Sequence, residues 1–271
     1  MHELTIDDLR VPTLGFGTWQ LTGRTAYDAT RAALEVGYRH VDTAQIYRNE
    51  AEVGRAIADS EVDRDEVFLT TKVWRDQAQA PDVRASTRRS LDELGVDHVD
   101  LLLLHWPSDE YAPLAETLSA LTELRDAGLA RAIGVSNFPS HRLAEAFDLA
   151  PIVTDQVEHH PYLAVDPIRK VLSERGGFLT AYSPIAQGRV LDDPVLREVG
   201  EQHGLSPIQV TLRWLLQTGG TVAIPRSSKP ENIAANFAVW DVELSDDDMT
   251  RIAALDRGER LIDPDWIDDW D

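Results

Sequence analysis

The sequence contains no cysteine, which excludes disulfide bonds, zinc–thiolate sites and thiol nucleophiles. It also lacks any apolar run near the roughly 18–20 residues that a membrane-spanning helix needs. Its first ten residues, MHELTIDDLR, do not show the basic and then apolar order of a secretory signal. We therefore expect a soluble, cytoplasmic protein with no membrane partner.

Positive charge is scarce. The chain has 26 basic residues against 47 acidic ones, a formal net charge of −21, and a field of this sign repels nucleic acid, so a nucleic-acid partner is excluded. The only lysines are Lys72, Lys170 and Lys229. Acid-rich, lysine-poor surfaces resemble those of halophilic, haloarchaeal-like proteins, because about 1 M salt shortens the Debye length to about 3 Å and screens the repulsion. An ordinary acidic protein that prefers arginine is the alternative.

The pattern of apolar residues predicts an α/β fold. The 271 residues, 43 % of them hydrophobic, suffice for a single (β/α)8 TIM barrel domain over 1–271. Short apolar runs without strict alternation, typical of parallel strands buried on both faces, alternate with longer amphipathic runs. The strands are expected at 14–18, 38–42, 67–72, 99–105, 131–136, 152–156, 177–182 and 221–225. The helices are expected near 25–37, 49–60, 80–95, 113–128, 139–148, 166–175, 206–218 and 229–238, with two extra helices at 192–204 and 245–256 and an N-terminal hairpin closing the barrel bottom.

Local signals support these elements. Ser206 and Gln209 form a predicted capping box, and Ser228 and Glu231 form a second. An open doubly wound sheet shares the alternation of strands and helices, but it would need a glycine-rich loop after its first strand. The segment GFGTWQ has glutamine, Gln20, where the third glycine of that fingerprint belongs.

Chemically useful side chains follow three neighbouring strands at the end where barrel active sites lie. Asp42 ends the second strand, with Tyr47 in its loop, Lys72 ends the third and His105 ends the fourth. Neighbouring strands are about 5 Å apart, so these side chains can meet. A lysine cation within about 4–6 Å should lower the pKa of the Tyr47 phenol, and Asp42 should pair with Lys72. His105 could orient a carbonyl group toward Tyr47, and the absence of a convincing nucleophile suggests that hydride comes from outside the protein.

These residues lie within a set of motifs that resembles the aldo-keto reductase family nearly end to end. The motifs are GFGTW, HVDTAQIYRNE, TKVW, LLLLHWP, IGVSNF, DQVEHHPY, AYSPIAQG and IPRSSKPENIAANF. The resemblance is to the compact prokaryotic type, similar to diketogluconate and methylglyoxal reductases. It implies a barrel that binds extended NADPH without a Rossmann fold, and hydride transfer from nicotinamide to an aldehyde or ketone. The catalytic tetrad of the family falls on Asp42, Tyr47, Lys72 and His105, with Tyr47 as proton donor.

The resemblance also implies cofactor contacts. Ser136, Asn137 and Gln156 would hold the carboxamide, and Tyr182 would stack on the nicotinamide ring. The remaining matched positions are Thr18, then Ser183, Pro184 and Gln187 near the pyrophosphate, Arg226, Ser227 and Ser228 near the ribose 2′-phosphate, and Asn232 and Asn236 near the adenine end. Members that strongly prefer NADPH usually have arginine where this chain has Asn232. NADPH is therefore expected to be preferred by a smaller margin, with NADH also usable.

Tryptophans are expected to form the substrate pocket. Trp19, Trp74 and Trp106 each follow a barrel strand, and Trp266 in the tail should close over the mouth together with Trp270. The short loop after the fourth strand and the short tail predict an open pocket for small aldehydes, dicarbonyls or keto sugars. The chain is expected to be a monomer.

Two other functions stay open at this point. A Schiff-base aldolase would use Lys72 as its nucleophile, and a redox sensor would bind NADPH without catalysis. A metal site is not expected, because His159 and His160 are adjacent in the chain and so point in opposite directions in an extended strand.

Overall fold

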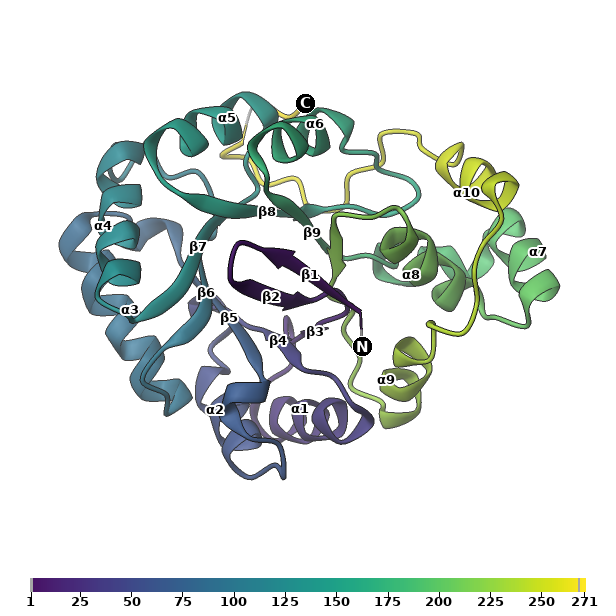
Figure 1. The fold of residues 1–271 in the computed structure, drawn as a ribbon, viewed down its shortest axis with the longest axis horizontal. Coiled ribbons are helices and arrows are strands. Elements are labelled where there is room, and N and C mark those ends of the chain that lie inside the picture. The colour runs from purple at the N-terminus through teal and green to yellow at the C-terminus, as the bar shows by residue number, and fades with distance from the viewer. Residues whose placement is uncertain (1, 268) are drawn as a thin grey trace.

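Parallel strands form a closed ring with helices around the outside (Figure 1). The structure is a computed structural model that describes residues 2–267 and 269–271, so positions 1 and 268 of the predicted domain lie outside it. Within this part, eight parallel strands pair in chain order from β3 to β10. The ring closes because Gly15 N donates to Ala223 O at 2.9 Å and Ala223 N donates to Thr13 O at 2.8 Å. The predicted (β/α)8 barrel is confirmed.

The element boundaries follow the sequence prediction closely. The barrel strands are β3 (Phe16–Gly17), β4 (His40–Asp42), β5 (Phe68–Val73), β6 (Val99–Leu104), β7 (Ala130–Ser136), β8 (Ile152–Glu158), β9 (Phe178–Tyr182) and β10 (Thr221–Ala223). The helices are α1 (Gly23–Val36), α2 (Glu50–Ala58), α3 (Ala80–Leu94), α4 (Leu114–Asp126), α5 (Ser140–Leu149), α6 (Asp166–Arg175), α7 (Pro194–His203), α8 (Pro207–Gln217), α9 (Pro230–Phe237) and α10 (Asp246–Ala253). Helices α7 and α10 are the two extra helices.

The N-terminal hairpin closes one end of the barrel. Strands β1 (Glu3–Ile6) and β2 (Leu9–Pro12) pair antiparallel and lie across the ring in Figure 1. Val11 packs in one apolar cluster with the inward-facing Leu101 and Leu103 of β6. Because the hairpin fills this end, a ligand can reach the interior only from the opposite end, where the strands finish.

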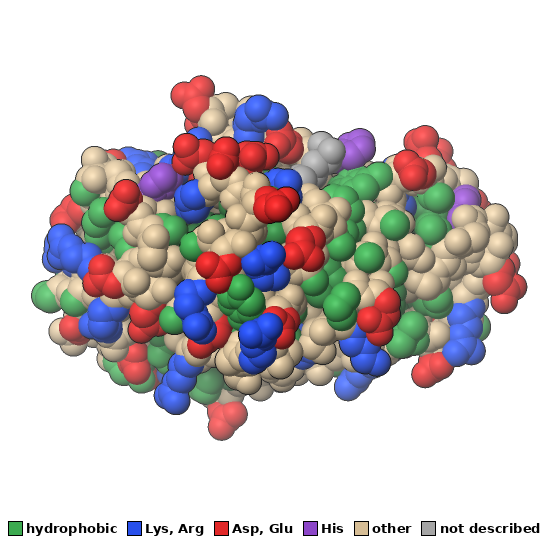
Figure 2. Space-filling view, turned by 90° about the horizontal axis from the view of Figure 1, so that it is seen from below, with side chains coloured by type: hydrophobic (Ala, Val, Ile, Leu, Met, Phe, Trp, Pro, Cys, Tyr) green, Lys and Arg blue, Asp and Glu red, His purple; other side chains and the backbone are tan. Residues whose placement is uncertain are grey.

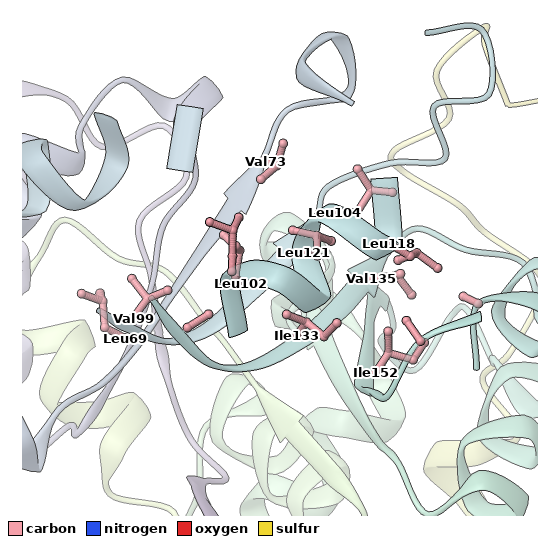
Figure 3. Packing of buried hydrophobic residues seen from close by; sticks show 14 of the residues in the cluster. Leu69, Val73, Val99, Leu102, Leu104, Leu118, Leu121, Ile133, Val135 and Ile152 are labelled. Carbon is pink, nitrogen blue, oxygen red and sulfur yellow. The ribbon is translucent and has the colours of Figure 1, made fainter. Parts of the chain in front are cut away.

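Strand β6 is a run of leucines without alternating polar residues because both of its faces are buried. Leu101 and Leu103 face the barrel interior, while Leu102 and Leu104 face outward. Figure 3 shows the outward pair beside Leu121 of α4. Both faces of the strand are buried, as in parallel sheets generally.

The two glycines of GFGTWQ allow the first and last barrel strands to approach closely enough to pair. A Cβ atom on Gly17 would lie 2.8 Å from the carbonyl oxygen of Ile224, and one on Gly15 would lie 2.9 Å from the ring of His40. Only glycine therefore fits where the first strand meets the last.

One of the two predicted capping boxes is present. The side chains of Ser206 and Gln209 cap α8 reciprocally, as expected. The second prediction is wrong, because α9 begins one residue later than expected. Its N-cap is Lys229, with no side-chain cap. Glu231 is therefore the second helical residue, whereas a capping box needs glutamate or glutamine at the third.

Acidic and basic side chains are interspersed on the face shown in Figure 2, with apolar side chains between them. Many arginines pair with acids on the surface, for example Arg84 with Glu123 at 2.6 Å. Such exposed pairs stabilise a fold by only about 0–1 kcal/mol each. No helix in the described residues is long and apolar enough to span a bilayer.

Candidate active site

Asp42, Lys72 and Tyr47 meet inside the open end of the barrel. Lys72 is wholly buried, and its Nζ lies 2.5 Å from Asp42 Oδ1. The same nitrogen donates to Thr43 O at 2.9 Å and to the Tyr47 hydroxyl at 3.4 Å. An ammonium has three hydrogens, so these contacts use all of them and hold Lys72 in one position.

A tight turn brings Tyr47 to Lys72. Residues Gln45–Tyr47 form a short 3-10 helix, η1, which ends at Arg48 in the left-handed region with φ 55°. The buried Asn49 holds this turn, because its amide nitrogen donates to the carbonyls of Thr18 and Leu21, both at 2.9 Å. Sequence reasoning missed Asn49, although it stands in the quoted motif HVDTAQIYRNE.

His105 completes the group. Its ring lies edge-on to Tyr47, with centroids 5.7 Å apart, and edge-on to Trp74, at 5.2 Å. Burial lowers the pKa of His105 well below 6.5, and the charge of Lys72 lowers it further. The imidazole is therefore neutral at physiological pH and has an N–H to donate from one ring nitrogen.

The predicted effect on the Tyr47 pKa is wrong. Burial raises the pKa of Tyr47 well above 10, and the negative charge of Asp42 adds to the rise. Lys72 does not reverse this, because Asp42 lies close enough to offset its charge. Burial likewise lowers the pKa of Lys72, against the opposing effect of Asp42.

A cavity of about 590 Å³ opens over these side chains. Predicted residues that line it are Asp42, Tyr47 and His105, the four tryptophans Trp19, Trp74, Trp106 and Trp266, and Thr18, Asn137, Gln156, Tyr182, Ser183, Pro184, Gln187 and Arg226. Ser136, Ser227, Ser228, Asn232 and Asn236 do not line it. Lining residues that the sequence analysis missed include Gln20, Ile46 and Ile262.

Polar side chains from β7, β8 and β9 form one connected network on the cavity wall. Tyr182 donates to Asn137 Oδ1 at 2.7 Å, and the Asn137 amide nitrogen donates to Ser136 Oγ and to His105 O, both at 3.0 Å. Gln156 donates to Asp42 Oδ2 at 2.7 Å. The Gln156 amide is thereby fixed beside Asp42, and the Asn137 amide is fixed between Tyr182 and His105.

The loop after β9 has an unusual backbone. Ala186, Gln187 and Gly188 have positive φ values of 47°, 52° and 94° in succession, and Ser183 has a φ of 46°. The N–H groups of Ala186 and Gly188 donate to Ser183 O and Ile185 O at 2.9 and 2.8 Å, so the loop is closed by its own hydrogen bonds. Strained backbone of this kind concentrates at binding sites. Arg226, which follows the neighbouring strand β10, donates to the Gln20 side chain at 2.5 Å.

The tail beyond α10 supplies part of the cavity wall. The wholly buried Glu158, at the end of β8, accepts the backbone N–H groups of Leu261 and Ile262, both at 2.8 Å. His160 also donates to Glu158, at 2.9 Å. Trp266 lines the cavity, as predicted. The tail ends beside α5 (Figure 1), where Asp271 accepts Ser140 N at 2.8 Å.

The two adjacent histidines are both engaged by the protein. His160 bonds to Glu158, as above, and His159 Nδ1 contacts Leu163 O at 2.8 Å. Burial lowers the pKa of His159 to about 3. Within the described residues, no group of three or more potential ligands is arranged to hold a metal ion.

The profile of the aldo/keto reductase family matches residues 13–257. This chain belongs to the aldo/keto reductase family. It is 46 % identical over 263 residues to an aldo-keto reductase of Mycolicibacterium smegmatis, covering 96 % of this chain and 95 % of the relative. It is 40 % identical to methylglyoxal reductase DkgB of Yersinia pestis, covering 96 % and 98 %.

Solved structures agree with this assignment. One that bears the name 2,5-diketo-D-gluconic acid reductase B matches with a TM-score of 0.97 at 42 % identity, covering 100 % of this chain and 98 % of that one. The aldo/keto reductase family uses nicotinamide cofactors, and the cavity of this member fits one by its chemistry. Amide groups suited to a carboxamide line the cavity beside the ring of Tyr182. The loop that directly follows Tyr182, and Arg226 after the neighbouring strand, line it as well, and the guanidinium suits a phosphate.

Proposed function

We propose that this aldo/keto reductase reduces aldehydes and ketones to alcohols, with NADPH as hydride donor and Tyr47 as proton donor. The observation that carries the proposal is the Tyr47 hydroxyl, which lines the cavity beside His105 and lies 3.4 Å from a wholly buried ammonium. Bound reduced nicotinamide would supply the hydride, and Asn137, Gln156 and Tyr182 would hold it.

The raised pKa of Tyr47 is compatible with proton donation. A carbonyl oxygen that receives the hydride's negative charge becomes an alkoxide, which is a far stronger base than a phenolate. Such an oxygen takes the proton even from a phenol whose pKa is well above 10. Neutral His105 would donate a hydrogen bond to the same oxygen, and Lys72 would stabilise the phenolate that remains.

The aldolase alternative has no support from the geometry. Lys72 does not line the cavity, and its three hydrogens are already committed to protein oxygens. A Schiff-base nucleophile must be neutral and reach its substrate, and Asp42 opposes the loss of the Lys72 proton.

Steady oxidation of NADPH with a panel of small aldehydes, in molar KCl, tests the proposal. Turnover of at least one aldehyde is expected. Tight NADPH binding with no turnover of any carbonyl would favour the redox sensor instead. If borohydride in the presence of substrate labelled Lys72, the Schiff-base aldolase would be the better hypothesis.

Arg226→Ala should weaken NADPH binding by about ten- to hundredfold and leave NADH binding nearly unchanged. A hydrogen bond to a charged group contributes about 1.5–3 kcal/mol, and each 1.4 kcal/mol is tenfold in affinity. Fluorescence titration with both cofactors measures the two losses, and Arg24→Ala on the outside of α1 is the control. Equal losses would show that Arg226 does not meet the 2′-phosphate.

The rate of reduction at saturating cofactor should be flat from about pH 6 to 9. The pKa of His105 is lowered well below 6.5, so His105 gains no proton in this range. The pKa of Tyr47 is raised well above 10, so Tyr47 loses none. A kcat profile against pH measures this. A step near 6.5 that disappears in His105→Gln would contradict the neutral imidazole.

We further propose that the protein works in a cytoplasm of high salt. The support is its composition, with 47 acidic and 26 basic residues. Self-repulsion among the acids is screened at about 1 M salt, so the melting temperature should fall by several degrees as KCl is removed. A melting temperature that is constant from low to molar KCl would count against halophily.

A further inference from the structure

The cavity wall next to Tyr47 and His105 is apolar and uncharged. We call Ile46, Trp74, Trp106, Ile262 and Trp266 the apolar wall. All five line the cavity, and Trp106 lies edge-on to Trp266 with ring centroids 6.0 Å apart. Among the described residues that line the cavity, Arg226 is the one cation. It follows β10, which lies opposite β6 in the ring of strands.

The arginine that packs against the apolar wall is covered and neutralised. Arg75 comes directly after Trp74, and its guanidinium carbon lies 4.7 Å from the centroid of the Trp266 ring and 5.1 Å from that of Tyr111. Its Nη2 lies 3.0 Å from Glu110 Oε2, and the side chain is 11 % exposed. Arg75 does not line the cavity.

The tail places a second guanidinium near this wall in the same manner. Arg260 stacks on Trp270, with its guanidinium carbon 3.7 Å from the ring centroid, and Arg260 does not line the cavity either. In both places a tryptophan covers the cation. A substrate group that enters the apolar wall therefore meets indole and aliphatic carbon.

The charge of the substrate decides whether such a wall helps or hinders. A carboxylate placed against it would lose water and find no cation in exchange, so its binding would be disfavoured. An aromatic or bulky apolar group would gain contact with several rings. Building on the proposed reduction, we propose that the preferred substrate is an uncharged aldehyde with an aromatic or bulky apolar group. Sugar acids and other carboxylate-bearing carbonyls are poor substrates, unlike what the name of the diketogluconate-reductase neighbour implies for that protein.

A matched pair of aldehydes tests the effect of charge. The values of kcat/KM are measured with NADPH for 4-methylbenzaldehyde and 4-carboxybenzaldehyde, which have similar size and differ mainly in charge. The neutral compound should be favoured by about ten- to hundredfold, mostly through KM. Equal values, or a preference for the acid, would overturn the inference. Failure to oxidise NADPH with any aldehyde, propanal included, would instead reject the proposed function.

A second comparison tests the contribution of apolar contact. 4-Methylbenzaldehyde should have a larger kcat/KM than propanal, and Trp266→Ala should reduce this advantage. A larger value for propanal in the wild-type enzyme would overturn the aromatic preference.

Glu110→Gln tests the neutralised arginine without touching the cavity. Removing the carboxylate leaves the Arg75 charge uncompensated beside the apolar wall. The ratio of kcat/KM for 4-methylbenzaldehyde to that for 4-carboxybenzaldehyde should fall by about two- to fivefold. The effect is this small because a charge near the surface acts through a high effective dielectric constant. Glu123→Gln removes the same charge from an exposed pair with Arg84 on the outer helices and should leave the discrimination unchanged. Equal effects of the two variants would show that Arg75 does not influence the cavity.

Discussion

Tyr47→Phe should reduce the rate of carbonyl reduction by about 10²–10⁴-fold while NADPH binds with wild-type affinity. General acid catalysis contributes about 10²–10⁴-fold, and no other phenol is placed beside Lys72 in the described residues. Phenylalanine keeps the ring that packs edge-on against His105 and removes only the hydroxyl. Single-turnover kinetics and fluorescence titration of NADPH separate the two effects.

The control is Tyr27→Phe, which removes a hydroxyl that donates to Asp59 on the outside of the barrel. Its turnover should equal that of the wild type. If Tyr47→Phe retained near-wild-type turnover, the proton would have to come from another group, and His105 would be the first residue to examine.

Asp42→Ala should lower the free energy of unfolding by about 3–5 kcal/mol, the usual cost of removing one partner from a buried ion pair. The variant leaves Lys72 wholly buried without its carboxylate and also removes the acceptor of the Gln156 amide. Urea unfolding followed by circular dichroism measures the loss. The double variant Asp42→Ala with Lys72→Met should be more stable than Asp42→Ala alone.

The loss of unfolding free energy in Asp42→Ala should depend on pH. Burial already lowers the pKa of Lys72, and Asp42 opposes that fall, so without Asp42 the folded pKa falls further below its unfolded value. The unfolded chain then binds more protons than the folded one, and stability rises with pH. The difference in unfolding free energy between the wild type and Asp42→Ala should therefore shrink between about pH 7 and 10. A difference that is constant over this range would mean that Lys72 keeps its proton without Asp42.

The sequence predicted the barrel well because each barrel strand is buried on both faces and marked by a short apolar run. It also placed Asp42, Lys72 and His105 correctly at strand ends, since in a barrel chain order determines which strands are neighbours. The shortest elements were less predictable. Strand β3 has only two residues, and its contact with the last strand consists of single backbone bonds such as those from Gly15 N to Ala223 O and from Gly17 N to Pro225 O.

What could not be predicted depends on distance and desolvation. The sequence shows that Asp42, Tyr47 and Lys72 can meet, but it does not show how strongly burial acts on the phenol. Burial, with the charge of Asp42 adding to it, raises the pKa of Tyr47 instead of lowering it. Ile46 and Gln20 were missed for a similar reason, since both stand beside recognised residues and only the turn geometry, such as the positive φ of Gln20 at 63°, places them at the cavity.

The attachment of the C-terminal tail to the carboxylate of Glu158 is useful for protein engineering. Glu158 belongs to strand β8 but holds the chain more than a hundred residues later, at Leu261 and Ile262. The tail is therefore attached to the barrel at a fixed point just before the residues that follow Ile262. Exchange of this segment between relatives should succeed when the junction follows Ile262 and the recipient keeps the acid. A junction placed before Leu261 would also replace the two residues whose N–H groups Glu158 accepts.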